Sequence, residues 1–199
     1  MALPGRAGKS TRRRSRRLLW VGAGGAVVVV AVVAVLALGL LGGSRPVHTL
    51  ITPAKLGTYV REPQLEQQMD AKALQQQVIA KSSGQASHVV YAVYEDKAGG
   101  VGGTSPLILF IGGNLSGISP SGFISSFTTQ FKGAQNTSAG SMGGQAACVN
   151  AQANVTGSIT LCLWADNDTF GVVASPTMSV AQLAAQMRTI RPLVERVAK

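Results

Sequence analysis

Residues 158–174 read SITLCLWADNDTFGVVA, in which two apolar runs flank a polar tripeptide at 166–168. Apolar runs that are rich in β-branched and aromatic residues and bounded by turn formers are typical of β-strands. The aspartate and asparagine between them tolerate the positive φ angles of tight turns. We therefore expect two antiparallel strands, at 158–165 and 169–174, joined by a hairpin turn.

Helices are expected on both sides of this hairpin in the sequence. Apolar residues at helical spacing predict one helix over 63–81, one from Pro120 onward and one at the end of the chain. Ser179 and Gln182 have the spacing of a capping box, which marks the start of the last helix. Pro192 should kink or divide that helix, because proline lacks the amide proton that a helix interior needs.

Three further strands are expected from short apolar runs at 88–94, 107–111 and 145–151. Together these elements form one domain over 61–199, which is long enough to bury its own core. The order of the elements predicts an α+β fold, in which helices pack on a mostly antiparallel sheet of about five strands. An N-terminal transmembrane helix is expected to precede this domain.

The net charge of +10 is concentrated at the start of the chain. Residues 1–17 carry seven of the 18 basic residues and no acidic one, which leaves 11 basic and 8 acidic residues, a net +3, for the rest. A short basic segment beside a bilayer is drawn to anionic lipids. We interpret 1–17 as a basic cytoplasmic tail and expect no nucleic acid among the partners.

Residues 18–41 read LLWVGAGGAVVVVAVVAVLALGLL and contain no charged residue. At a rise of about 1.5 Å per residue, a helix of this length covers a hydrocarbon core of about 30 Å. Basic residues flanking such a span stay on the cytoplasmic side, and tryptophan favours the headgroup boundary. We expect a single-pass cell-membrane anchor with the N-terminus in the cytoplasm, oriented by Arg12, Arg13, Arg14, Arg16, Arg17 and Trp20.

The alternative for this segment is a cleaved signal peptide, whose apolar region is normally shorter. Whether the anchor is ever cleaved stays open. Residues 42–60 contain glycine and proline and are interpreted as a linker to an extracytoplasmic domain at 61–199.

The chain has two cysteines, Cys148 and Cys162, and both fall in predicted strands. An even pair outside the cytoplasm favours a disulfide, and buried free thiols are the alternative. A metal site is the least favoured, because His48 and His88 lie far from both cysteines in the sequence. We expect a disulfide, no cofactor and no metal.

Cys162, Trp164, Asp166, Thr169 and Gly171 form a Cys-x-Trp-x-Asp-x-x-Thr-x-Gly pattern, followed by an arginine-containing helix at 187–191. With the tail and anchor before it, this pattern resembles a group of uncharacterised single-pass membrane proteins of actinobacteria such as Streptomyces. The order of helix, sheet, disulfide and terminal helix is more remotely similar to the exported sensor domains of actinobacterial receptor kinases. The resemblance to the membrane proteins implies a location and no activity.

Two features of the pattern have competing interpretations. Asp166 and Asp168 form either a calcium or acid/base pair or the turn of the hairpin, and we favour the turn because no other carboxylates lie near them in the sequence. Trp164 is either a platform for a ligand or a core residue near the disulfide, and we favour packing.

Catalysis requires a nucleophile with a base, a carboxylate pair or a metal, and the sequence shows no such set. We therefore expect a non-catalytic, membrane-anchored extracytoplasmic binding or sensing module. The alternative is a cell-envelope structural or assembly factor, and a hydrolase comes third. The expected partners are the lipid bilayer and either an extracytoplasmic ligand or other cell-envelope proteins. An apolar pocket lined by Trp164, Tyr91 or Phe110 would favour binding, and a flat exposed strand edge would favour assembly.

Overall fold

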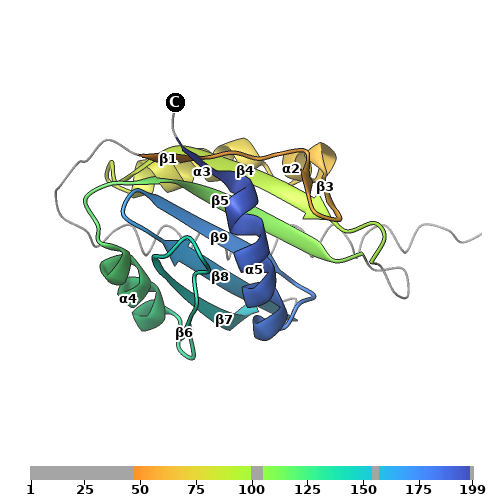
Figure 1. Ribbon diagram of the computed structural model, residues 1–199. Helices are drawn as coiled ribbons and strands as arrows, with labels where there is room; N and C mark the ends of the chain where they lie inside the picture. The colour runs from red at the N-terminus through yellow and green to blue at the C-terminus, as the bar shows by residue number, and fades with distance from the viewer. Residues whose placement is uncertain (1–46, 100–104, 154–156, 198–199) are drawn as a thin grey trace, which may run out of the picture.

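The computed structural model describes residues 47–99, 105–153 and 157–197 of the 199-residue chain. Within these ranges, eight strands form an antiparallel sheet in the order β2-β3-β4-β5-β9-β8-β7-β6, and β1 pairs with β10 in a separate antiparallel ribbon (Figure 1). The elements in chain order are β1 (His48–Leu50), β2 (Lys55–Leu56), β3 (Tyr59–Arg61), α2 (Pro63–Gln68), α3 (Ala71–Lys81), β4 (Ala86–Glu95), β5 (Leu107–Leu115), α4 (Pro120–Gln130), β6 (Gln135–Thr137), β7 (Gln145–Ala153), β8 (Gly157–Ala165), β9 (Thr169–Ser175), α5 (Val180–Val194) and β10 (Glu195–Val197).

The expected hairpin is confirmed as β8 and β9, which lie inside the sheet between β7 and β5. Every residue of β9 is buried. A strand whose two faces are both covered needs a continuous apolar run, and this explains why the hairpin sequence does not alternate with polar residues. The strands expected at 88–94, 107–111 and 145–151 are present as β4, β5 and β7, each longer than predicted.

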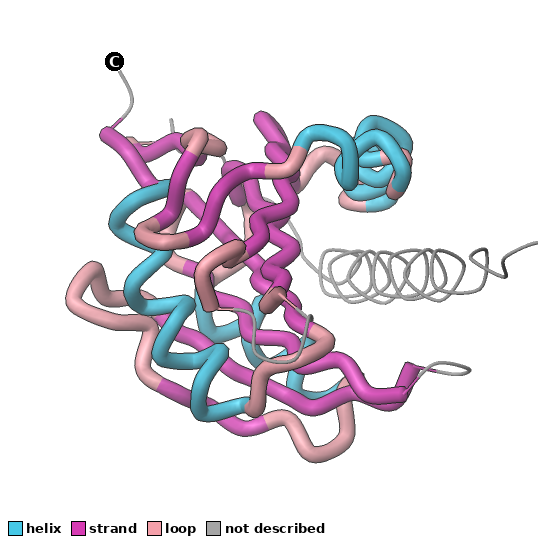
Figure 2. The backbone as a smooth tube through the Cα atoms, turned by 90° about the vertical axis from the view of Figure 1, so that its right-hand side faces the viewer, coloured by secondary structure: helices cyan, strands magenta, loops and turns pink. Residues whose placement is uncertain are grey.

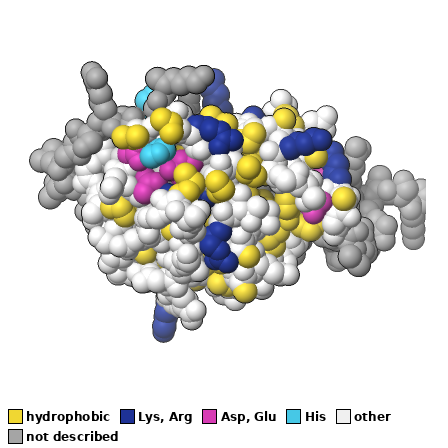
Figure 3. All heavy atoms as spheres, in the orientation of Figure 1, with side chains coloured by type: hydrophobic (Ala, Val, Ile, Leu, Met, Phe, Trp, Pro, Cys, Tyr) yellow, Lys and Arg dark blue, Asp and Glu magenta, His cyan; other side chains and the backbone are white. Residues whose placement is uncertain are grey.

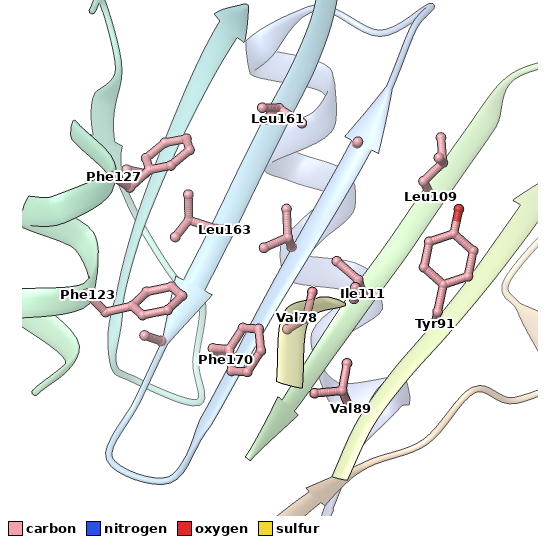
Figure 4. Packing of buried hydrophobic residues seen from close by; sticks show 14 of the residues in the cluster. Val78, Val89, Tyr91, Leu109, Ile111, Phe123, Phe127, Leu161, Leu163 and Phe170 are labelled. Carbon is pink, nitrogen blue, oxygen red and sulfur yellow. The ribbon is translucent and has the colours of Figure 1, made fainter. Parts of the chain in front are cut away.

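Two apolar cores lie on opposite faces of this sheet. Figure 2 shows α5 on one side of the strands and the α2–α3 pair on the other. On the α2–α3 side, α4 also packs on the sheet, with the Phe123 ring 5.5 Å from that of Phe170 (Figure 4). On the other side, α5 and the β1–β10 ribbon cover the sheet, and α5 buries Leu183, Ala184, Met187, Ile190 and Val194.

The helix boundaries follow the sequence signals with two differences. The capping box at the start of α5 is confirmed, since the Ser179 amide donates to Gln182 Oε1 at 2.9 Å. Pro192 lies inside α5 without dividing it, because the helix ends two residues later and only its last turn is affected. The helix expected over 63–81 is two helices, broken at Asp70, whose φ of 50° is left-handed.

The predicted fold class, an α+β domain of about five strands behind an N-terminal transmembrane helix, was wrong. The sheet has eight strands, helices cover both of its faces, and a two-stranded ribbon lies beside it. The strands that the sequence did not reveal have only two or three residues each, too few to show a period of two. They are β1, β2, β3, β6 and β10.

None of the helices in the described part of the chain is long and apolar enough to cross a membrane. The predicted tail at 1–17 and the predicted span at 18–41 lie outside the described residues. Part of the predicted linker at 42–60 belongs to the fold, because β1 and β2 form there and Gly57 turns the chain into β3 with a φ of 63°. Because this part of the predicted linker is folded, His48 belongs to the folded domain and is available to the site described below.

Candidate functional site

Cys148 of β7 and Cys162 of β8 form the predicted disulfide. The two residues stand directly opposite each other in the register of the strands, and both are buried on the α5 face. In the chain-entropy model, a crosslink that closes a loop of about 15 residues contributes about 3 kcal/mol to stability. The disulfide therefore has a structural role on this face of the sheet.

Trp164 lies in the same core as the disulfide, so the packing interpretation is confirmed. Its ring is nearly parallel to that of Phe110, at a centroid distance of 6.0 Å, and it crosses the backbone of Gly171 on the next strand. A Cβ atom at position 171 would lie 2.2 Å from the indole ring. Glycine is required here because any side chain would occupy the space of the tryptophan.

Asp166 closes the turn between β8 and β9. Its Oδ1 accepts hydrogen bonds from the amides of Asp168 at 3.1 Å and Thr169 at 2.7 Å, and from the Thr169 hydroxyl at 3.0 Å. This is the geometry of a side chain that caps a turn. The hairpin interpretation of Asp166 is confirmed, and the spacing of Asp166 and Thr169 in the sequence pattern follows from it.

Arg191 of α5 joins this turn to the end of the chain. Its side chain is only 1% exposed, and it donates to Asp166 Oδ2 at 2.6 Å and to Glu195 Oε2 at 2.8 Å. It also donates to the carbonyl oxygens of Ala139 and Gly143. A buried guanidinium is tolerated only when charged and hydrogen-bonding partners surround it, and here they do.

Asp166 and Glu195 titrate differently within this cluster. Burial raises the pKa of Glu195, and although Arg191 lowers it, the neighbouring Asp166 carboxylate raises it further, so that it ends above its ordinary value. For Asp166, burial acts in the raising direction, but hydrogen bonds from the Asp168 amide, Glu195 and Thr169 outweigh it and lower the pKa. Asp166 is thus the carboxylate that stays ionised, and Glu195 the one that takes up a proton more readily.

Asp168 holds the start of β1 against the same turn. Its Oδ2 accepts hydrogen bonds from the amides of Val47 and His48, and its Oδ1 lies 3.2 Å from His48 Nδ1. Asn114 of β5 donates to the His48 carbonyl at 2.6 Å. The interpretation of Asp168 as a turn residue was therefore incomplete, because its carboxylate makes contacts 120 residues away in the sequence.

Four of these groups, His48, Asp166, Asp168 and Glu195, border a cavity of about 440 Å³. Figure 3 shows acidic side chains gathered beside a histidine, with hydrophobic side chains next to them. The size is within the range of small-molecule sites. The cavity is lined by His48, Pro120, Met142, Gly144, Asp166, Asn167, Asp168 and Glu195.

The charges around the cavity do not balance. Three carboxylates line it together with His48, which contacts Asp168, and the buried cation Arg191 lies behind the wall. With Glu195 protonated and His48 neutral, Asp166 and Asp168 leave one more negative charge than Arg191 offsets. In the part of the chain that the structure describes, no group of three or more His, Cys, Asp and Glu side chains is arranged to hold a metal ion.

The Cys-x-Trp-x-Asp-x-x-Thr-x-Gly pattern thus contains one residue of the cavity wall and does not reveal the others. Asp166 belongs to the cavity wall, whereas Cys162, Trp164, Thr169 and Gly171 support it from the core or the turn. Sequence reasoning missed the roles of His48, Asn114, Arg191 and Glu195. The signal for Arg191 was present, since it lies four residues after the buried Met187 on an otherwise apolar helix face. The predicted orienting residues Arg12, Arg13, Arg14, Arg16, Arg17 and Trp20 lie outside the described residues.

No protein-family model matches this chain, and neither a search of curated proteins nor a search of solved structures finds a match.

Proposed function

We propose that this protein is a non-catalytic binding module, anchored at the membrane through 18–41 with its domain outside the cytoplasm, and that its cavity takes a small cationic ligand. The observation that carries the proposal is the cavity itself, with three carboxylates in its wall and one buried cation behind them. Sites for small molecules are commonly concave, with a few convergent polar groups. The anchoring rests on the sequence alone.

The chemistry of the wall indicates which ligand fits. Asp166, Asp168 and Glu195 give one side of the cavity carboxylate groups, which attract a cationic head group and form stronger hydrogen bonds with charged donors than with neutral ones. Pro120 and Met142 give it an apolar side. An amine or a guanidinium group on a short aliphatic chain would use both sides.

The expected criterion of an apolar pocket lined by Trp164, Tyr91 or Phe110 does not apply, because all three are buried in the two cores. For the assembly alternative, the terminal strands β2 and β6 have only two and three residues, and short edge strands protect against pairing with other chains. β6 pairs with residues 146–148 alone, so the β7 edge without a strand partner among the described residues is confined mainly to 149–153.

A hydrolase would use the contact between His48 and Asp168, since a carboxylate on Nδ1 orients a histidine for proton transfer. However, the described lining residues include no serine, threonine or cysteine that could act as a nucleophile beside it. Asp168 also binds two backbone amides, so its contacts serve first to hold β1 in place. We therefore favour binding over catalysis.

Binding at the cavity is tested by titrating butylamine into the full chain in detergent micelles and following amide signals by NMR. Signals of residues 142–144 and 166–168 should shift and saturate. Met142→Trp places an indole at the cavity wall and should block the shifts, whereas Ile79→Trp, on α3 and away from the cavity, should not. Shifts that are equal in both variants, or absent from the wild type, would contradict the proposal.

The location is tested with protease added to intact cells that carry the full chain with an epitope tag at each end. The tag after the domain should be lost, while the tag before residue 18 should stay protected. Protection of both tags would show that the domain is not outside the cytoplasm.

A further inference from the structure

The β1–β10 ribbon forms part of the cavity wall without being a strand of the large sheet. His48 of β1 and Glu195 of β10 line the cavity, and the other lining residues come from Pro120, from the segment before β7 and from the β8–β9 turn. The ribbon is short, pairing three residues of each strand from His48 opposite Val197 to Leu50 opposite Glu195. We infer that this ribbon is a strap that opens and closes the cavity.

Polar contacts hold the β1 side of the strap. Asp168 accepts hydrogen bonds from the amides of Val47 and His48 and also contacts the His48 ring. Asn114 donates to the His48 carbonyl, and the same amide group donates to the Asp168 carbonyl at 3.2 Å. The side-chain contacts of β1 therefore come from one carboxylate and one amide that belong to the sheet and its turn, and the Ile51 amide, just after β1, donates to the Val194 carbonyl at 2.8 Å.

The β10 side is held by the buried cation. Glu195 accepts from Arg191 at 2.8 Å, and Arg191 contacts Asp166, two residues before Asp168. The contacts thus connect β1 through the β8–β9 turn and α5 to β10 in a ring, and His48, Asp166, Asp168 and Glu195 of this ring line the cavity. Breaking the ring at one point removes support from both strands of the strap.

The apolar contribution to the strap is small. Leu50 is buried and packs on Gly112 of β5, but Val47 and Val197 are 61% and 69% exposed. Regions with few buried apolar contacts open locally at lower free energy than the core. In contrast, every residue of β9 is buried, so the sheet beneath should stay closed while the strap opens.

Opening the strap removes His48 and Glu195 from the wall and leaves the β8–β9 turn in place. Access to the cavity then depends on the strap and not on an opening of the sheet. The inference goes beyond the proposed function, because the strap would gate this cavity whatever the charge of its ligand.

The test is native-state hydrogen exchange on the full chain in micelles, measured by NMR at increasing sub-denaturing urea. Amides of residues 47–51 and 195–197 should exchange as one group, with a lower opening free energy than the amides of β5 and β8. The opening free energy of this group should be nearly independent of the urea concentration. Asp168→Asn should speed exchange of the strap amides about tenfold or more, from the loss of charge-assisted hydrogen bonds. Asp96→Asn, which changes a carboxylate on the exposed loop after β4, should leave them unchanged.

Strap amides that share the opening free energy and urea dependence of β5 and β8 would overturn the inference, because they would then exchange only when the whole domain unfolds. Equal exchange in the Asp168→Asn and Asp96→Asn variants would also overturn it. If Asp168→Asn does not fold, the urea dependence of exchange in the wild type alone decides whether the strap opens independently of the domain.

Discussion

Two ion-pair clusters, one around the partly exposed Arg61 and one around the buried Arg191, differ in their balance of charge. Arg61 faces Glu66 with two parallel hydrogen bonds of 2.7 and 2.8 Å, and its remaining contacts go to Thr52. Glu66 in turn accepts from the Val93 amide and so fastens α2 to β4. One cation meets one carboxylate there, and neither residue lines the described cavity.

Arg191 faces two carboxylates, Asp166 and Glu195, and both border the cavity. Each cluster joins separate elements of the fold, so an ion pair does not by itself indicate a site. The difference lies in the unbalanced charge and the open space beside it. Perturbed pKa values next to a cavity are a known signature of functional groups, whereas a balanced pair is explained by structure alone.

The largest effect expected from this comparison is on stability. Arg191→Met should cost about 3 to 5 kcal/mol of unfolding free energy, because it removes the cation that two buried carboxylates share. Arg61→Met should cost less, about 1 to 3 kcal/mol, because only one buried carboxylate, Glu66, loses its cation and this carboxylate keeps the hydrogen bond from the Val93 amide. Urea denaturation of both variants measures the difference, and equal losses would contradict the distinction between the clusters.

The next effect concerns the packing beneath Arg191, whose guanidinium carbon lies 5.8 Å from the centre of the Trp164 ring. Gly171→Ala should cost about 1 to 3 kcal/mol, because the new methyl group would overlap that ring. The same change in a Trp164→Leu background should cost much less. A double-mutant cycle measures this coupling, and an additive result would show that the ring does not fix the choice of glycine.

A smaller effect is expected in the pH dependence of stability. The folded Glu195 binds its proton more tightly than the unfolded chain, whose glutamates titrate near 4.5. Its contribution is complete below that value and is lost as the pH rises through the raised pKa of the folded state. The wild type should therefore lose stability relative to Glu195→Gln as the pH rises above 4.5.

Unfolding free energies of the two proteins, measured at a series of pH values from 4.5 upward, provide the measurement. A difference between them that stays constant with pH would show that Glu195 titrates alike in the folded and unfolded states, against the account of the Arg191 cluster.

The sequence predicted the long elements and the disulfide because these depend on local patterns. The hairpin at 158–174 and the capping box at Ser179 specify their structure within a few residues. The strap could not be predicted, because three residues around His48 carry no period and their partners lie near the far end of the chain. The same limit applies to the site, whose members converge only when β1, β5, the β8–β9 turn and α5 come together.

The most direct test of the central claim compares butylamine, butanol and butyrate, which share a four-carbon chain and differ in the charge of the head group. Dissociation constants for the full chain are measured by NMR titration at one pH and one ionic strength. An excess of carboxylate over cation at the cavity predicts that butylamine binds about tenfold or more tightly than butyrate, with butanol between them. Butyrate binding as tightly as butylamine would contradict the claim.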